Sequence, residues 1–97
     1  MSRRESYSDT FTGRLDQNIR ELLEENDTSE GAKLRRILLK IIKNELTPRQ
    51  REIIMLYYFK SMDISSIASE LDISPQSVSA TMSRARLRIF RILQYYF

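Results

Sequence analysis

The residues with the clearest recognition chemistry lie near the C-terminus, where small polar side chains precede a run of arginines. Five of these residues could meet the edges of DNA bases: Gln76, Ser77, Ser79, Ala80 and Ser83. Glutamine can pair with adenine, serine can bond to several bases, and alanine can contact the methyl group of thymine. The segment therefore favours contacts in the major groove of a DNA duplex, although an ordinary solvated helix face is an alternative that the sequence leaves open.

Phosphate contacts are expected from the arginines that follow. No acidic residue lies between Ile73 and Phe97, and the arginines of this stretch are Arg84, Arg86, Arg88 and Arg91. Guanidinium groups and the amide groups at a helix start are common partners of DNA phosphates. We therefore expect Arg84, Arg86 and Arg88, together with Ser74 at the helix start, to hold the DNA backbone.

The charge of the chain is unevenly distributed. The net charge is only +3, and residues 1–45 carry as many acidic as basic side chains. The whole basic excess lies in residues 46–97, which contain seven basic and four acidic side chains. A local basic excess is typical of a surface that binds a polyanion, although an excess of this size is also found on solvated faces.

The composition argues against most catalytic and metal chemistry. The 97-residue chain contains no cysteine and no histidine, which removes disulfides, the usual zinc ligands and the residue best suited to proton transfer near neutral pH. Ser65, Ser66 and Ser69 lack a recognisable base beside them and are expected to be cap or solvent residues. We expect no enzyme activity, no metal and no cofactor.

The N-terminal sequence and the length of the apolar runs indicate where in the cell the protein is expected. The chain starts with Met1-Ser-Arg-Arg-Glu, which lacks the apolar run of a signal peptide, and no apolar stretch is long enough to cross a membrane. We therefore expect a cytoplasmic protein that does not enter the membrane.

An all-α fold is predicted because glycine and proline are scarce and apolar residues recur at helical spacing. We expect a flexible N-terminal arm over residues 1–12 and one helical domain over 13–97. Helices are predicted over 14–25, 32–44, 48 to about 60, 64–71 and 75 to about 94, with a loop over 26–31. The last two helices would form a helix-turn-helix over residues 63–94.

Three helix starts carry clear capping signals. Thr47 can cap the helix that begins at Pro48, and Gln50 can complete a capping box. Asp63 and Ser74 can cap the next two helices in the same way. Asp63 therefore marks the start of the predicted helix-turn-helix, and Ser74 marks the start of its second helix.

The turn between the last two helices also has a recognisable pattern. The small side chain of Ala68 would allow the helices to approach closely, while Ile73 and Val78 pack into the angle between them. Asp72 stands where the chain must reverse, and a left-handed backbone is tolerable for aspartate. We therefore predict positive φ at Asp72. The aromatic run from Tyr57 to Phe59 is expected to lie in the core.

The C-terminus carries more apolar residues than a helix-turn-helix needs to bury: Ile89, Phe90, Ile92, Leu93, Tyr96 and Phe97. They could pack on the predicted N-terminal helix, through Leu15, Ile19 and Leu22, or on a second copy of the chain. We favour the internal contact because the N-terminal helix otherwise lacks a partner; a homodimer through the C-terminal helix is the alternative.

Three segments together resemble region four of bacterial sigma factors. They are Leu46 to Phe59 (LTPRQREIIMLYYF), Ile64 to Val78 (ISSIASELDISPQSV) and Ser83 to Ile89 (SRARLRI). LuxR-type regulators share the opening and the helix pair, but the Tyr-Tyr-Phe end and the Arg-Ala-Arg run favour the sigma family. The resemblance implies an all-α helix-turn-helix domain that reads promoter DNA and contacts the β flap of RNA polymerase.

The sequence departs from that family at some positions. Asp72 replaces the usual turn glycine. At the positions where sigma factors often place base-reading arginine and glutamate, this sequence has Pro75, Gln76, Ser79 and Ala80. No segment resembles region two, which opens the −10 element. We therefore expect a stand-alone transcription regulator or partial sigma factor that binds duplex DNA and, between Ala32 and Lys60, RNA polymerase or a companion sigma subunit. The alternative is a module that binds polymerase or a sigma factor with little DNA affinity.

Overall fold

The computed structural model describes residues 14, 16–24 and 29–96, and every described element is helical. The segment 16–24 is followed by α2 (Ser29–Asn44), α3 (Pro48–Tyr58), α4 (Ile64–Leu71), α5 (Pro75–Leu93) and a short 3-10 turn, η1 (Gln94–Tyr96). The predicted all-α class is confirmed. The arm predicted for residues 1–12 lies outside the described residues.

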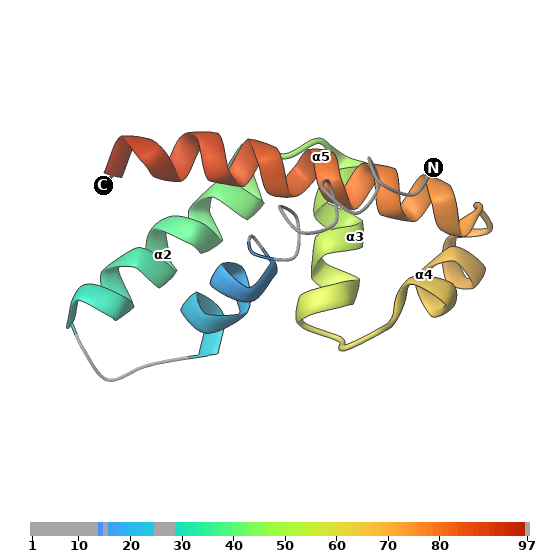
Figure 1. Cartoon of the computed structure of the whole chain (residues 1–97), viewed down its shortest axis with the longest axis horizontal. Helices are drawn as coiled ribbons and strands as arrows, with labels where there is room; N and C mark the ends of the chain where they lie inside the picture. Colours follow the sequence, from blue (N-terminus) through green and yellow to red (C-terminus); the bar gives the residue numbers. More distant parts are fainter. Residues whose placement is uncertain (1–13, 15, 25–28, 97) are drawn as a thin grey trace.

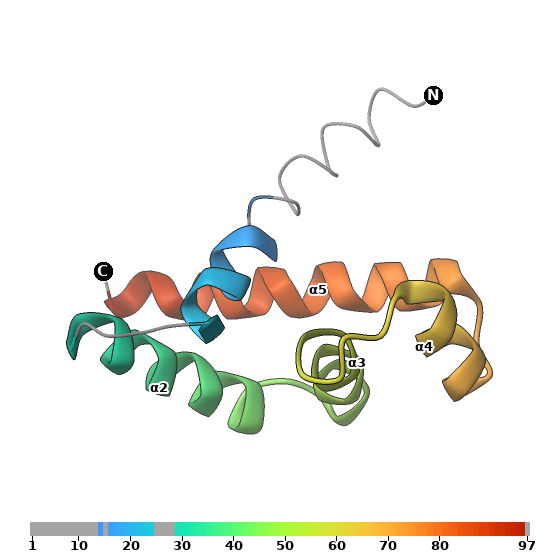
Figure 2. The ribbon, with the colours of Figure 1, turned by 90° about the horizontal axis from the view of Figure 1, so that it is seen from below.

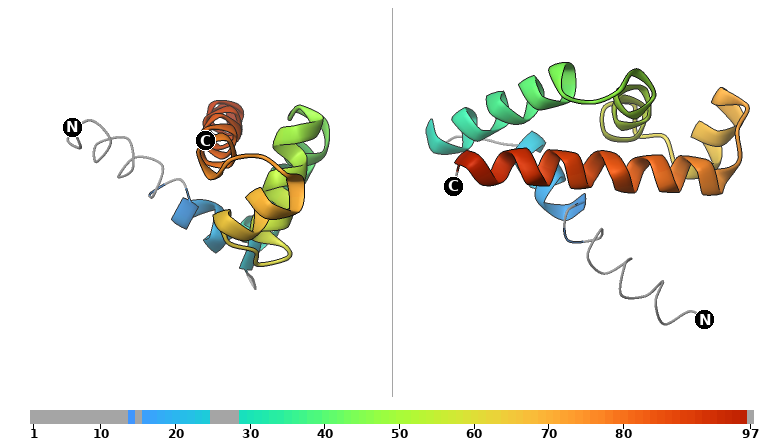
Figure 3. Two further views of the ribbon diagram at one scale, coloured as in Figure 1. Left: turned by 90° about the vertical axis from the view of Figure 1, so that its right-hand side faces the viewer. Right: turned by 90° about the horizontal axis from the view of Figure 1, so that it is seen from above.

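The longest helix, α5, organises the rest of the molecule. It runs along the full length of the domain, and α2, α3 and α4 follow one another along it (Figures 1 and 2). All three pack against α5, and α3 also contacts both α2 and α4. The segment 16–24 lies between α2 and α3 and crosses α5, as the views in Figure 3 also show. The helix-turn-helix therefore occupies one end of α5, while α2 and the N-terminal segment occupy the other.

One apolar core joins these helices. The segment 16–24 and the helices α2, α3, α4 and α5 all contribute to it, because apolar side chains recur at the spacing that places them on one face of a helix. The largest fully buried side chains are Leu38, Ile42, Ile53, Ile54, Ile67, Val78, Met82 and Ile89. No charged or polar residue of the described part is buried to the same degree.

The capped helix starts predicted at Pro48 and Ile64 are confirmed in atomic detail. At α3 the backbone N–H of Gln50 donates to Thr47 Oγ1 over 3.2 Å, and the N–H of Thr47 donates to Gln50 Oε1 over 3.1 Å, which completes the capping box. Asp63 caps α4 by accepting from the N–H of Ser66 over 2.8 Å. These bonds satisfy amide groups that have no partner within the helix.

The predicted turn between α4 and α5 is also confirmed. Asp72 has φ 58° and ψ 46°, the left-handed conformation. This conformation lets the N–H of Ile73 return to the carbonyl of Ala68 over 3.0 Å. Ala68 is itself buried in the core, where a larger side chain would push the helices apart.

Some sequence-based boundaries and burial assignments were wrong. The helix predicted from residue 32 begins at Ser29, so part of the predicted 26–31 loop belongs to α2. Tyr57 and Tyr58 are partly buried as expected, but Phe59 is 45% exposed. The reason is that α3 ends at Tyr58, so Phe59 is the capping residue and leaves the buried face.

The packing of the C-terminal half of α5 agrees with the predicted internal contact. Ile19 is only 3% exposed and lies in the same core cluster as Ile89 and Leu93. Together with Leu22 and Phe90 these residues line an apolar hollow between the segment 16–24 and α5. Leu15 and Phe97, which were also predicted to take part, lie outside the described residues.

Candidate nucleic-acid interface

The candidate DNA surface is the face of α5 that points away from the core. The buried face of α5 is formed by Val78, Met82, Ala85, Ile89 and Leu93, at intervals of three and four residues. The helical period then places the predicted base-contacting residues toward solvent. Gln76, Ser77, Ser79 and Ala80 are exposed, and Ser83 is half-buried at the edge. The structure thus brings the five residues to one side of the first turns of α5.

The start of α5 is organised by two serines. Ser74 Oγ accepts the backbone N–H of Ser77 over 3.1 Å, and the hydroxyl of Ser74 donates to Ser77 Oγ over 3.1 Å. The Ser74 hydroxyl is therefore already engaged in the cap. A base or phosphate contact by Ser77 would have to use the remaining capacity of its own hydroxyl.

The three arginines predicted to meet phosphates occupy different environments. Arg84 is exposed, and no ion pair or hydrogen bond links its side chain to another described residue. The Arg88 side chain, 51% exposed, reaches back toward Glu45, with Nε 3.3 Å from the carbonyl oxygen and Nη2 3.5 Å from Oε1. Arg88 thus remains accessible, but its guanidinium group is partly committed to the loop that follows α2.

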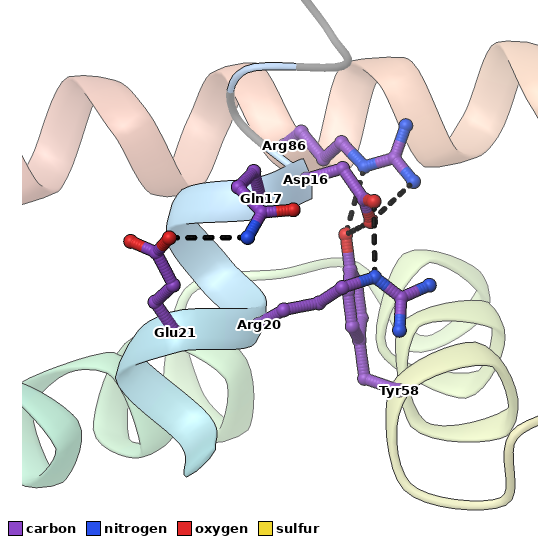
Figure 4. Close-up of polar contacts among 6 residues, drawn as sticks. All are labelled: Asp16, Gln17, Arg20, Glu21, Tyr58 and Arg86. Carbon is purple, nitrogen blue, oxygen red and sulfur yellow. Dashed lines mark hydrogen bonds and ion pairs between the residues drawn. The ribbon is translucent and has the colours of Figure 1, made fainter. Parts of the chain in front are cut away.

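Arg86 does not belong with the exposed arginines. Its side chain is only 12% exposed; Nε donates to Tyr58 Oη over 3.0 Å, and Nη2 lies 3.3 Å from Asp16 Oδ1 (Figure 4). This position corrects the sequence-based grouping of Arg86 with solvent-facing phosphate contacts. Its guanidinium group instead joins α5 to α3 and to the segment 16–24.

Asp16 lies at the centre of this polar cluster. Its Oδ1 accepts the Tyr58 hydroxyl as well as Arg86, and its Oδ2 pairs with Arg20 Nε over 3.0 Å. The Arg20 guanidinium also lies over the rings of Tyr57 and Tyr58, 5.1 and 5.4 Å from their centroids. One carboxylate thus meets two guanidinium groups beside a pair of tyrosines, and charge-assisted hydrogen bonds and cation–π contacts hold this partly buried cluster together.

The environment of the cluster changes the acidity of two of its groups. Burial, and then the bond to Asp16, raise the pKa of Tyr58 well above its usual range, although Arg86 opposes the shift. The hydrogen bond to Asp16 raises the pKa of Arg20. Tyr58 is therefore a neutral donor over the normal pH range, and its role is structural. Nothing local in the sequence could have revealed a contact between residues 70 positions apart.

The described part of the chain lacks the features of a metal site and of a membrane-spanning helix. Within it, no group of three or more acidic, histidine or cysteine residues could hold a metal ion. None of its helices has the length and apolar character that crossing a bilayer requires.

Comparisons with known proteins agree with the helix-turn-helix geometry. No curated protein and no solved structure matched the chain. The family model described as sigma-70, region 4, matches residues 34–89, which include α3, α4 and most of α2 and α5. Region 4 is a helix-turn-helix domain that binds DNA in RNA polymerase-dependent transcription. The match covers more than half of the residues of this chain, and the chain therefore belongs to the sigma-70 region 4 family.

Proposed function

We propose that this protein is a stand-alone transcription regulator or partial sigma factor that reads promoter DNA and contacts RNA polymerase. The observation that supports it most is the exposed face of α5, where Gln76, Ser79 and Ala80 lie beside Arg84. The left-handed turn at Asp72 sets this helix at an angle to α4, the arrangement by which a recognition helix enters the major groove.

We propose that bases are met by Gln76, Ser77, Ser79, Ala80 and Ser83, and phosphates by Arg84, Arg88 and the start of α5 at Ser74. Selection from a random duplex library at fixed salt tests this proposal. An enriched site is expected, and Gln76→Ala should relax preference at one base position at a cost of about 1–3 kcal/mol. The absence of any enriched site, with binding that does not fall as salt rises, would contradict DNA reading.

The polymerase contact is proposed to lie on the helices between Ala32 and Lys60, facing the β flap or a companion sigma subunit. Since the residues that open a promoter are proposed to come from another protein, this chain and core polymerase alone should not start transcription at a selected site. Transcription in vitro with and without an added sigma factor tests this division of labour. Specific initiation without the added factor would overturn it.

A protein-interaction module with little DNA affinity is the second candidate. The bond between Ser74 and Ser77 favours it, because it reduces the hydroxyl capacity available to bases at the start of α5. Capture of polymerase or of a sigma factor without salt-dependent binding to duplex DNA would decide for this candidate.

The packing of the C-terminal half of α5 supports a proposal about the oligomeric state. Because Ile19 already covers Ile89 and Leu93, we propose a monomer in place of a dimer through α5. Sedimentation should then give the monomer mass. A dimer that Leu93→Asp converts into a folded monomer would contradict this assignment.

A further inference from the structure

A second basic surface lies on α2, at the other end of the molecule from the helix-turn-helix (Figure 1). We call it the α2 basic face and define it by the exposed side chains of Lys33, Arg36, Lys40 and Lys43. These residues recur at intervals of three and four, so the four cations form one stripe of roughly 15 Å along the helix. No acidic residue lies between Gly31 and Asn44 to interrupt it.

Among the described residues, no acidic side chain balances the charges of this stripe. No ion pair joins Lys33, Arg36, Lys40 or Lys43 to another described residue. Like charges three and four residues apart each cost a few tenths of a kcal/mol of helix stability. A partner of opposite charge would relieve this repulsion.

The stripe also borders exposed apolar surface. Leu39 is 39% exposed, and it lines a shallow hollow with Ile37 and the four cations of the α2 basic face. A duplex backbone presents phosphates and sugars, so an apolar floor would contribute little to binding it. A floor of this kind inside a basic rim suits a helix that carries acidic groups around an apolar side chain.

The position of α2 separates this surface from the proposed DNA surface. The buried side of α2, at Leu38 and Ile42, belongs to the core that α2 shares with α5, and the α2 basic face lies on the reverse side of α2. The exposed face of α5 lies on the reverse side of α5 from that same core. The two cationic surfaces therefore point in different directions, and a straight duplex on α5 leaves the α2 basic face free.

We infer that the α2 basic face binds an acidic amphipathic helix of a protein partner. Glutamate or aspartate side chains of that helix would pair with the four cations, and an apolar side chain would enter the hollow at Ile37 and Leu39. This inference rests on the proposal that the helices between Ala32 and Lys60 contact the transcription apparatus, and it specifies the chemistry of the partner.

The test uses a fluorescent synthetic peptide with leucines on one helical face and glutamates beside them. A peptide of the same composition in scrambled order has equal charge but no apolar face. Anisotropy with the full chain should show saturable binding of the amphipathic peptide and clearly weaker binding of the scrambled one. Lys40→Glu should weaken the first complex about tenfold, because it turns one attraction into a repulsion.

Matched variants separate this surface from general charge effects. Arg91→Glu makes the same change in net charge on the exposed side of α5 and should leave the peptide affinity within about twofold, because Arg91 does not line the hollow on α2. Leu39→Gln keeps the charge and should weaken the amphipathic peptide severalfold while leaving the scrambled one unchanged. Circular dichroism of each variant checks that the helices are intact.

The outcomes also distinguish this inference from the proposed function. Equal binding of the two peptides, or equal losses with Lys40→Glu and Arg91→Glu, would overturn the inference. A loss of duplex affinity in Lys40→Glu would identify the stripe as a second DNA surface and overturn it as well. Peptide binding that follows the expected pattern, without capture of core polymerase, would keep the inference and reject the polymerase contact.

Discussion

The two ends of α5 are built on different principles. At the helix-turn-helix end, neighbouring residues determine the shape: Asp63 and Ser74 cap their helices, and Asp72 turns the chain between them. At the other end, contacts between distant residues dominate, above all the ion pair of Asp16 with Arg86. The capping bonds need only a short segment to fold. The Asp16 cluster needs three distant segments of the chain to come together.

We expect the helix-turn-helix end of α5 to serve recognition and the other end to serve the stability of the fold. The first turns of α5 leave polar side chains exposed, so changes there should alter binding more than folding. The region around Ile19 and Asp16 lies largely outside residues 34–89, which match the family, yet it completes the core and takes one arginine of α5 out of solvent. The following variants test this separation, in order of decreasing effect.

The largest effect is expected from the apolar contact of the N-terminal segment. Ile19→Ala removes a side chain that is only 3% exposed and should lower the free energy of unfolding by about 2–5 kcal/mol. Denaturant melts provide the measurement. Met55→Ala, at a side chain that is 41% exposed, is the control and should cost far less. Equal losses would mean that the segment 16–24 is not part of the cooperative unit.

The next effect concerns Arg86 and Arg84, two arginines of the same helix. Arg86→Ala removes the partly buried guanidinium group that bonds to Asp16 and to the Tyr58 hydroxyl, and it should cost about 1–3 kcal/mol of unfolding free energy. Arg84→Ala should change stability little, but it should lower the salt slope of DNA binding by about one unit because it removes a proposed phosphate contact.

A double-mutant cycle with Asp16→Asn checks that the stability loss comes from the cluster. The coupling with Arg86→Ala should be large, and the coupling with Arg84→Ala should be close to zero. If Arg86→Ala lowers the DNA salt slope as Arg84→Ala does, then Arg86 leaves the cluster when DNA binds.

Alkaline titration gives a smaller, pH-dependent effect. The pKa of Tyr58 is raised on folding, so the native state favours the neutral phenol. Its contribution to stability is complete below the ordinary tyrosine value of about 10 and falls as pH rises above that value. The wild-type protein should therefore lose stability above pH 10 more steeply than Tyr58→Phe. Parallel losses in the two proteins would exclude Tyr58 as the titrating group.

The same contrast explains what could be predicted from the sequence. The caps at Thr47, Asp63 and Ser74 and the turn at Asp72 were predictable, because each depends on residue types within a few positions. The role of Arg86 was not, because its neighbours suggested a row of exposed arginines and its partner lies 70 positions away. The helical spacing of apolar residues placed Ile19 on one face of a helix and indicated its contact with α5. It did not indicate the polar cluster beside that contact.

The smallest effect is expected at the two left-handed residues. Ser61, in the turn after α3, has φ 56°, and Asp72 has φ 58°. Glycine adopts this conformation without a steric penalty but gains freedom in the unfolded chain. Aspartate tolerates the left-handed region better than serine does, so Ser61→Gly should stabilise by up to about 1 kcal/mol, while Asp72→Gly should range from neutral to a similar gain.

Chemical denaturation of both variants, with Ser69→Gly inside α4 as the control, measures these differences. The control should lose about 0.5 kcal/mol, because glycine weakens a helix interior. A clear loss of stability in Asp72→Gly would mean that the aspartate contributes more than its backbone conformation to the turn. The helix-turn-helix end would then depend on a side-chain contact, as the other end of α5 does, and the separation between the two would no longer hold.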